Sequence, residues 1–144
     1  MSKSKVLYSP RGRASEYGSY AINIYKGCTH GCLYCYAKRF SGAFFHAAYP
    51  KDNVLERIER DLSVFKNKDK PIVLSFMGDV YQPYEMQSKL MRETLILLRK
   101  YGCKVSILTK GGDRSKRDFD IISSMDAWYG ATLTFISESD SKHY

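Results

Sequence analysis

Hydrophobic and polar residues alternate along the chain with two different periods. In three segments apolar side chains recur at helical spacing opposite charged ones, which predicts amphipathic helices at residues 54–65, 85–101 and 113–125. Asp113 stands where the N-cap of the third helix is expected. Short runs rich in aliphatic, β-branched or aromatic residues predict strands at 20–25, 71–78, 103–109 and 128–136. Residues 1–19 mix Lys, Arg, Gly, Ser and Pro without a sustained period, which predicts a basic N-terminal arm or loop.

The predicted strands and helices alternate from residue 20 to the C-terminus. This order is typical of an α/β fold with a parallel sheet and right-handed crossovers. Ligands of such sheets bind where the strands end at their carboxyl termini. The pattern therefore predicts that four polar or glycine-containing loops meet at one rim: the cysteine-rich loop at 26–38, "GDVYQPYE" at 78–85, "KGGD" at 110–113 and "ISESD" at 136–140.

The composition fits one domain with a packed core, because 44% of the 144 residues are hydrophobic. The longest apolar runs fall short of the roughly 18 residues that a membrane helix needs. The polar start "MSKSK" does not resemble a secretory signal. We therefore expect a cytoplasmic protein with no membrane partner, in which free thiols stay reduced and clustered cysteines hold a metal more often than they form disulfides.

The chain is strongly basic, with a formal net charge of +8 and an isoelectric point near 9.3. A positive field of this kind attracts polyanions, which makes nucleic acid a candidate partner. A solvated basic surface explains the same charge, because no helix-turn-helix, zinc-finger or RNA-recognition pattern orders the basic residues. Both interpretations stay open at this point.

Three cysteines stand close together in "KGCTHGCLYCYAK" at residues 26–38. Cys28, Cys32 and Cys35 form the pattern C-x3-C-x2-C. Three thiolates from one loop can hold three irons of a 4Fe-4S cluster, whereas a cluster held wholly by protein needs four. One iron is then open to a further ligand. Cys103 is expected to be a buried structural thiol instead of the fourth ligand, because it begins the third strand at the opposite end of the sheet.

Two other chemistries use closely spaced thiols. His30 could complete a Cys3His zinc site with the three cysteines, which would make the protein a small zinc-binding nucleic-acid module. All four ligands would then come from one short loop, whereas structural zinc sites usually join two separated pairs. A disulfide would leave an odd thiol in the loop and needs an oxidising compartment.

The motif C-x3-C-x-aromatic-C, here Cys28, Cys32, Tyr34 and Cys35, resembles the signature of the radical S-adenosylmethionine (SAM) enzymes. With "NIYKGCTHGCLYCYAK", "MGDVYQPYE" and "LTKGG" it resembles the branch that contains spore photoproduct lyase. The resemblance extends from about Tyr17 to the C-terminus. It implies a partial TIM-like (β/α) barrel in which residues 20–144 supply about four of the usual six strand-helix units. A core truncated in this way would leave an apolar sheet edge that a partner chain could cover.

The resemblance also implies roles for individual residues. Cys28, Cys32 and Cys35 would ligate three irons, and the amino and carboxylate groups of SAM would bind the fourth. Asp79 and Glu85 resemble acidic rim positions of the branch. The implied cofactor-binding positions are Tyr34 beside the adenine, Ser75, Met77 and Gly78 at the amino group, Lys110 at the carboxylate, and Thr132 and Thr134 near the carboxylate or ribose.

The activity that the resemblance implies is reductive cleavage of SAM to methionine and a 5′-deoxyadenosyl radical, which abstracts hydrogen from a substrate. Such an enzyme, lyase-like in this branch, needs an electron donor such as a flavodoxin or ferredoxin. DNA or RNA is a candidate substrate, because the chain is basic and resembles a DNA-repair lyase. The alternative is a truncated iron–sulfur or SAM-binding protein without catalytic activity, because the later strands usually help to hold the adenine and ribose.

Overall fold

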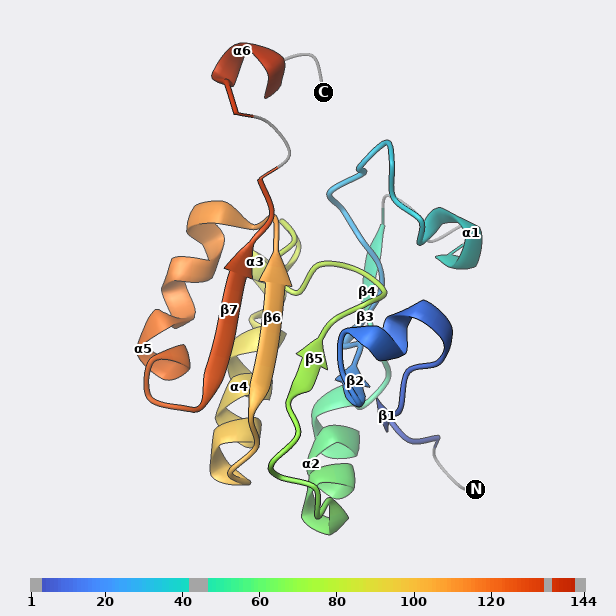
Figure 1. The fold of residues 1–144 in the computed structure, drawn as a ribbon, viewed down its shortest axis with the longest axis vertical. Helices are drawn as coiled ribbons and strands as arrows, with labels where there is room; N and C mark the ends of the chain where they lie inside the picture. The colour runs from blue at the N-terminus through green and yellow to red at the C-terminus, as the bar shows by residue number, and fades with distance from the viewer. Residues whose placement is uncertain (1–3, 42–46, 134–135, 142–144) are drawn as a thin grey trace.

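The computed structural model describes residues 4–41, 47–133 and 136–141, and its centre is a five-stranded sheet (Figure 1). Strand β1 is antiparallel to β2, and the following neighbours are all parallel. Consecutive parallel strands that lie side by side are the arrangement of a (β/α) barrel, so the predicted α/β class is confirmed. The strand order across the sheet is β1 (Leu7–Tyr8), β2 (Tyr20–Ile22), β5 (Ile72–Leu74), β6 (Val105–Thr109) and β7 (Ala127–Ala131).

Two long helices cover one face of this sheet, α2 (Val54–Val64) and α4 (Leu90–Lys100), which pack against each other, and Figure 1 shows α4 behind β6 and β7. Their apolar stripes, including Ile58 and Leu95, are fully buried in one core with the strand residues Leu74 and Ile107. Each such side chain contributes about 1.5–3 kcal/mol by burial. The short helical segments are α1 (Lys38–Ser41), α3 (Glu85–Ser88), α5 (Phe119–Ile122), α6 (Glu138–Ser141) and the 3-10 helices η1 (Gly12–Glu16) and η3 (Gly112–Asp118).

The opposite face of the sheet is open at β6 and β7. Side chains alternate along a strand, so Leu108 and Trp128 point away from the helices, and they are 51% and 59% exposed. Towards β2 the same face is covered, since η1 stands in front of it in Figure 1 and a β-carbon added at Gly18 would lie 2.6 Å from Val73 Cγ2. This face corresponds to the interior of a barrel.

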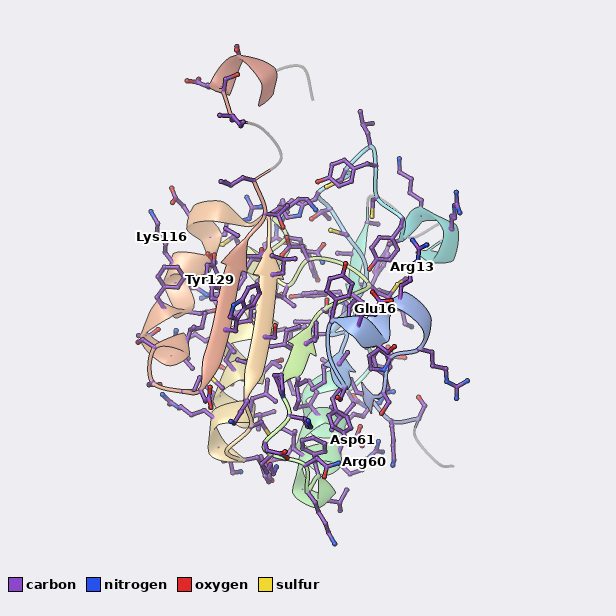
Figure 2. All side chains as sticks on the ribbon, in the orientation of Figure 1. Arg13, Glu16, Arg60, Asp61, Lys116 and Tyr129 are labelled. Carbon is purple, nitrogen blue, oxygen red and sulfur yellow. The ribbon has the colours of Figure 1, made fainter. Side chains whose placement is uncertain are left out.

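Residues 4–19 differ from the free arm that the sequence predicts. Val6 and Leu7 are buried, and β1 forms the edge of the sheet. Their backbone N–H groups donate to Asp61 Oδ2 of α2 at 2.7 and 3.1 Å, and Figure 2 shows Asp61 beside Arg60 at this edge. The pattern does not reveal the strand, because only two residues pair and a carboxylate from a distant helix holds them.

The Asp61 contacts predict an acid-sensitive attachment of β1. Burial would raise the pKa of Asp61, but the Leu7 and Val6 N–H groups and Arg60 outweigh it and lower that pKa. The stabilisation is therefore fully present above the unfolded-state pKa of about 3.9 and is lost as the pH falls through the lower folded-state value. Urea unfolding should show wild type more stable than Asp61→Asn at neutral pH, with the difference shrinking at about pH 3. A difference that is the same at both pH values would contradict this prediction.

The strand predicted at 20–25 is interrupted at Asn23. The Asn23 side chain accepts the Phe76 and Met77 N–H groups at 3.0 and 3.1 Å, so it binds the loop after β5 where sheet pairing would continue. This explains why β5 ends at Leu74, although its apolar run continues to residue 78. Beyond Asn23 the chain forms a separate two-stranded sheet, in which β3 (Tyr25–Gly27) pairs with β4 (Ala48–Pro50).

The helix predicted at 54–65 is confirmed, and the one at 85–101 is broken. Lys89 has a left-handed φ of 53° between α3 and α4. The carboxylate of Glu85 accepts the Met91 N–H at 2.9 Å and so replaces the backbone acceptor that a continuous helix would supply.

The third predicted helix and the fourth predicted strand are both shorter than expected. Residues 112–118 form η3, so Asp113 lies within it and pairs with Lys116 at 2.6 Å instead of capping a helix. Strand β7 ends at Ala131, short of residue 136. In Figure 2, Tyr129 of β7 points towards η3, where its hydroxyl bonds Ser115 at 2.6 Å. None of the helices in the described part of the chain has the length and apolar character that crossing a membrane requires.

Candidate metal centre and cofactor site

The cysteine loop leaves β3 at the end of the sheet towards which β5, β6 and β7 point (Figure 1). Cys28, Cys32 and Cys35 are all partly buried free thiols, and a turn joins the last two through a 3.2 Å bond from Cys35 N to Cys32 O. Burial raises the pKa of the Cys28 thiol. A bound cation would favour the thiolate and reverse that effect.

The donor set of this loop fits an iron–sulfur cluster. Thiolates are the ligands that such clusters use, and this loop supplies three cysteines, all of them partly buried. Within residues 4–41, 47–133 and 136–141, no three Cys, His, Asp or Glu side chains stand close enough together to hold a single metal ion. A cubane presents its irons at separate corners, so its ligands need not converge on one point.

The loop after β5 packs directly against the cysteine loop. Gly78 has a φ of 114°, and a β-carbon added there would lie 2.7 Å from the Gly27 carbonyl oxygen. Ser75 closes the same turn by donating from Oγ to the Gly78 carbonyl at 2.5 Å. Met77 is partly buried and is held by Asn23. The three predicted cofactor-binding positions Ser75, Met77 and Gly78 therefore lie together beside the cysteines.

Replacing Gly78 with alanine should destabilise the protein. The new β-carbon would overlap backbone and would also require a φ that L-residues rarely adopt, so we expect a loss of about 1–3 kcal/mol in the free energy of unfolding. Gly12→Ala is the matched control, because Gly12 also has a positive φ, of 61°, but no atom within 4 Å of the added carbon. Urea unfolding curves that coincide for the two variants would contradict the steric argument.

Asp79 connects three of the predicted loops. Its Oδ1 accepts hydrogen bonds from Tyr81 N at 2.8 Å and Thr109 Oγ1 at 2.5 Å, and its Oδ2 accepts Lys110 N at 2.7 Å. On the other side, Asp79 Oδ2 lies 3.5 Å from His30 Nδ1. This carboxylate thus holds the cysteine loop, the loop after β5 and the end of β6 at one rim, as the sequence predicts.

Both ring nitrogens of His30 face other partners. Nδ1 faces Asp79, and Nε2 lies 2.5 Å from Arg114 Nη2, which as a guanidinium can only donate. Burial is the main cause that lowers the pKa of His30. Because the guanidinium donates to Nε2, the ring proton is left to Nδ1, which faces the Asp79 carboxylate. This geometry gives no support to a zinc site in which His30 completes the cysteine ligands.

Lys110 and Tyr34, two of the predicted cofactor-binding residues, lie together. The ammonium of Lys110 is 5.0 Å from the centroid of the Tyr34 ring. Burial would lower the pKa of Lys110, but Tyr34, Cys32 and Asp79 outweigh it and raise that pKa, so the side chain is a cation at the rim. Such a cation can bind a carboxylate.

The other predicted positions have different outcomes. Thr132 is partly buried just beyond β7 and donates its N–H to the Thr109 carbonyl at 2.8 Å, whereas Thr134 lies outside the described residues. Cys103 is 3% exposed and precedes β6 at the end opposite the cysteine loop, as expected of a structural thiol. Helix α6 contains most of the fourth predicted loop, residues 136–140. In Figure 1 it stands apart from the rim at which the other three predicted loops meet.

Glu85 is not on the rim surface, where the sequence places it. The side chain is fully buried and bonds the Tyr25 hydroxyl and Arg117 Nη2, the latter at 2.8 Å. Arg117 also pairs at 2.7 Å with the equally buried Asp118. Sequence reasoning missed this pairing, because the partners are about 30 residues apart and an Arg-Asp pair in a basic segment looks like ordinary surface.

A comparison with protein families places this loop geometry in context. A family model described as the radical SAM superfamily matches residues 22–138, which include the cysteine loop and all four parallel strands except the first two residues of β2. The chain belongs to the radical SAM superfamily. Members of this superfamily typically use a 4Fe-4S cluster and SAM, and the three-cysteine motif stands at the expected rim.

The curated relatives are longer proteins. An uncharacterized protein of Methanocaldococcus jannaschii is 32% identical over 108 residues, which are 75% of this chain and 41% of the relative. Uncharacterized proteins of Mycobacterium bovis and Mycobacterium tuberculosis are 30% identical over 112 residues, or 72% of this chain and 33% of theirs. The chain thus spans well under half the length of these relatives. No solved structure matches it significantly.

Proposed function

We propose that the protein binds a 4Fe-4S cluster through Cys28, Cys32 and Cys35 and binds SAM at the remaining iron. The observation that carries this proposal is a three-thiol loop at the carboxyl end of a parallel sheet, within a chain of the radical SAM superfamily. Three ligands from the chain leave one iron to the cofactor. Zinc has no matching support, because His30 is held by Asp79 and Arg114.

The proposed activity is that of a radical SAM enzyme. When bound, the cluster and SAM would supply the reductive cleavage that yields 5′-deoxyadenosine after hydrogen abstraction from a substrate. The proposed contribution of the chain is to position them: Lys110 would offer a cation for the SAM carboxylate and Tyr34 an aromatic surface for the adenine. Thr132, and Thr134 by the resemblance alone, would offer hydroxyl groups to the carboxylate or ribose. Ser75, Met77 and Gly78 line the strand end where the amino group would lie. A flavodoxin or ferredoxin is the proposed electron donor.

Nucleic acid is the proposed substrate class, in a lyase-like role similar to that of the spore photoproduct lyase branch. The net charge of +8 supports it, and exposed basic residues stand before the cysteine loop at Arg11 and Arg13 and at its end at Lys38 and Arg39. Phosphate contacts give a binding constant that falls steeply with salt. Titration of labelled single-stranded and duplex DNA over a salt series should show such a slope, and weak binding with a flat salt dependence would contradict this part of the proposal.

A further chain or segment is proposed to complete the barrel. The open sheet face with Leu108 and Trp128 exposed supports this, because apolar surface of this kind is normally covered. The relatives, which extend well beyond the matched region, support it too.

Anaerobic reconstitution tests the function directly. Protein loaded with iron and sulfide should become brown, carry about four irons per chain, and release 5′-deoxyadenosine from SAM in the presence of a reductant. Cluster binding without release would favour the non-catalytic alternative. Colourless protein that retains zinc would favour the zinc module and overturn the proposal.

A further inference from the structure

One buried side chain of the loop after β5 binds the backbone on both sides of Cys28. Gln82 is 0% exposed. Its Oε1 accepts the Thr29 N–H at 2.8 Å, and its Nε2 donates to the Gly27 carbonyl at 3.4 Å. These two groups belong to the peptide units that precede and follow Cys28. A single amide therefore fixes the orientation of the Cys28 backbone.

We propose that Gln82 is a positioning residue that holds Cys28 in the direction required for cluster binding. The contacts themselves involve the chain alone, and only their link to cluster binding rests on the proposed function.

Further contacts fix the Gln82 side chain and its two backbone partners, which together we call the Gln82 clamp. Thr29 Oγ1 donates a second bond to Gln82 Oε1 at 3.3 Å, and the same hydroxyl accepts the Tyr84 N–H at 3.4 Å. The close approach of Gly78 to Gly27 brings the loop that carries Gln82 within reach of the cysteine loop. Because the amide is buried, water cannot replace these bonds when the side chain is removed.

An apolar replacement of Gln82 should release Cys28 and leave the core intact. In Gln82→Leu, the Thr29 N–H and the Gly27 carbonyl lose their buried partner. Water can reach these two groups only if the segment around Cys28 moves away from the loop after β5, so we expect Cys28 to become more accessible. Gln87→Leu is the matched control, because Gln87 lies exposed on the neighbouring helix α3. Gln82→Glu is the conservative variant, since its carboxyl group still accepts the Thr29 N–H and, when protonated, can donate to Gly27.

The first measurement uses the reduced, metal-free 144-residue chain and iodoacetamide, with the alkylation rate of each cysteine read by mass spectrometry. We expect Cys28 to react about tenfold faster in Gln82→Leu than in wild type, and to react at the wild-type rate in Gln87→Leu and near it in Gln82→Glu. Cys103, which is 3% exposed, reports global opening and should not change. An unchanged Cys28 rate, or equal acceleration of Cys28 and Cys103, would overturn the proposal.

The second measurement separates the clamp from the proposed function. In the reconstituted protein, a chelator should remove iron from Gln82→Leu about tenfold faster than from wild type or Gln87→Leu. Equal rates would overturn the role of Gln82 in cluster binding. Wild type that takes up no iron at all would instead overturn the proposed function, while the alkylation rates still decide whether Gln82 holds Cys28.

Discussion

Cys32→Ala is expected to reduce the iron content of anaerobically reconstituted protein from about four atoms per chain to less than one. Cys32 is the middle cysteine of the motif, and a cubane held by the chain at two corners would exchange or decay far more easily than one held at three. Iron analysis and the visible spectrum of the brown protein provide the measurement. The expected effect is near-complete loss, which makes this the most decisive substitution in the chain.

The control for this experiment is already present in the sequence. Cys103 is a buried thiol at the opposite end of β6, so Cys103→Ala should keep full iron content. Both variants remove one thiol, and the comparison therefore isolates the position of the sulfur. Iron retained by Cys32→Ala, or lost equally by both variants, would show that the three-cysteine loop is not the site.

Glu85→Ala is expected to lower the free energy of unfolding by about 3–5 kcal/mol, which is the usual cost of removing one partner from a buried ion pair. Glu85 accepts hydrogen bonds from Arg117 at 2.8 Å and from Met91 N at 2.9 Å, and it also bonds the Tyr25 hydroxyl. Its removal leaves the Met91 N–H without its acceptor and takes from Arg117 one of its two carboxylate partners, the other being Asp118. Urea unfolding followed by circular dichroism measures the loss.

Glu93→Ala provides the comparison for Glu85, because Glu93 lies exposed on the adjacent helix α4. Its replacement should change the free energy of unfolding by less than about 0.5 kcal/mol. If the two variants are equally stable, Glu85 does not hold β3, α4 and η3 together as its contacts indicate.

The elements with the strongest periodicity could be predicted from sequence. Helix α2 and the parallel strands follow from apolar spacing, because burial against a common core dictates that spacing. The cysteine motif and the convergence of three loops also follow, since the carboxyl ends of parallel strands meet at one edge. The strand predicted at 20–25 and the helix predicted at 85–101 are shorter than predicted, because a side chain replaces a backbone hydrogen-bond partner in each. Asn23 ends β2, and Glu85 accepts the Met91 N–H where the helix is interrupted at Lys89.

The candidate site was only partly accessible to sequence reasoning. Gln82 and Arg114 were missed, because their role depends on reaching a loop more than 50 positions away, which no local pattern encodes. The structure explains why position 111 is a glycine, which the motif "KGG" alone does not reveal. A β-carbon at Gly111 would lie 2.8 Å from the Tyr81 carbonyl oxygen. Gln82 stands in a loop that also contains Asp79 and Glu85, so its polarity alone does not distinguish it.

The way in which the loop after β5 grips the cysteine loop has a practical consequence for protein engineering. Residues 26–38 are not expected to keep their conformation when they are transplanted alone into a different scaffold, because they depend on contacts with Gly78, Asp79 and Gln82. A successful graft has to carry both segments, in the same relative register.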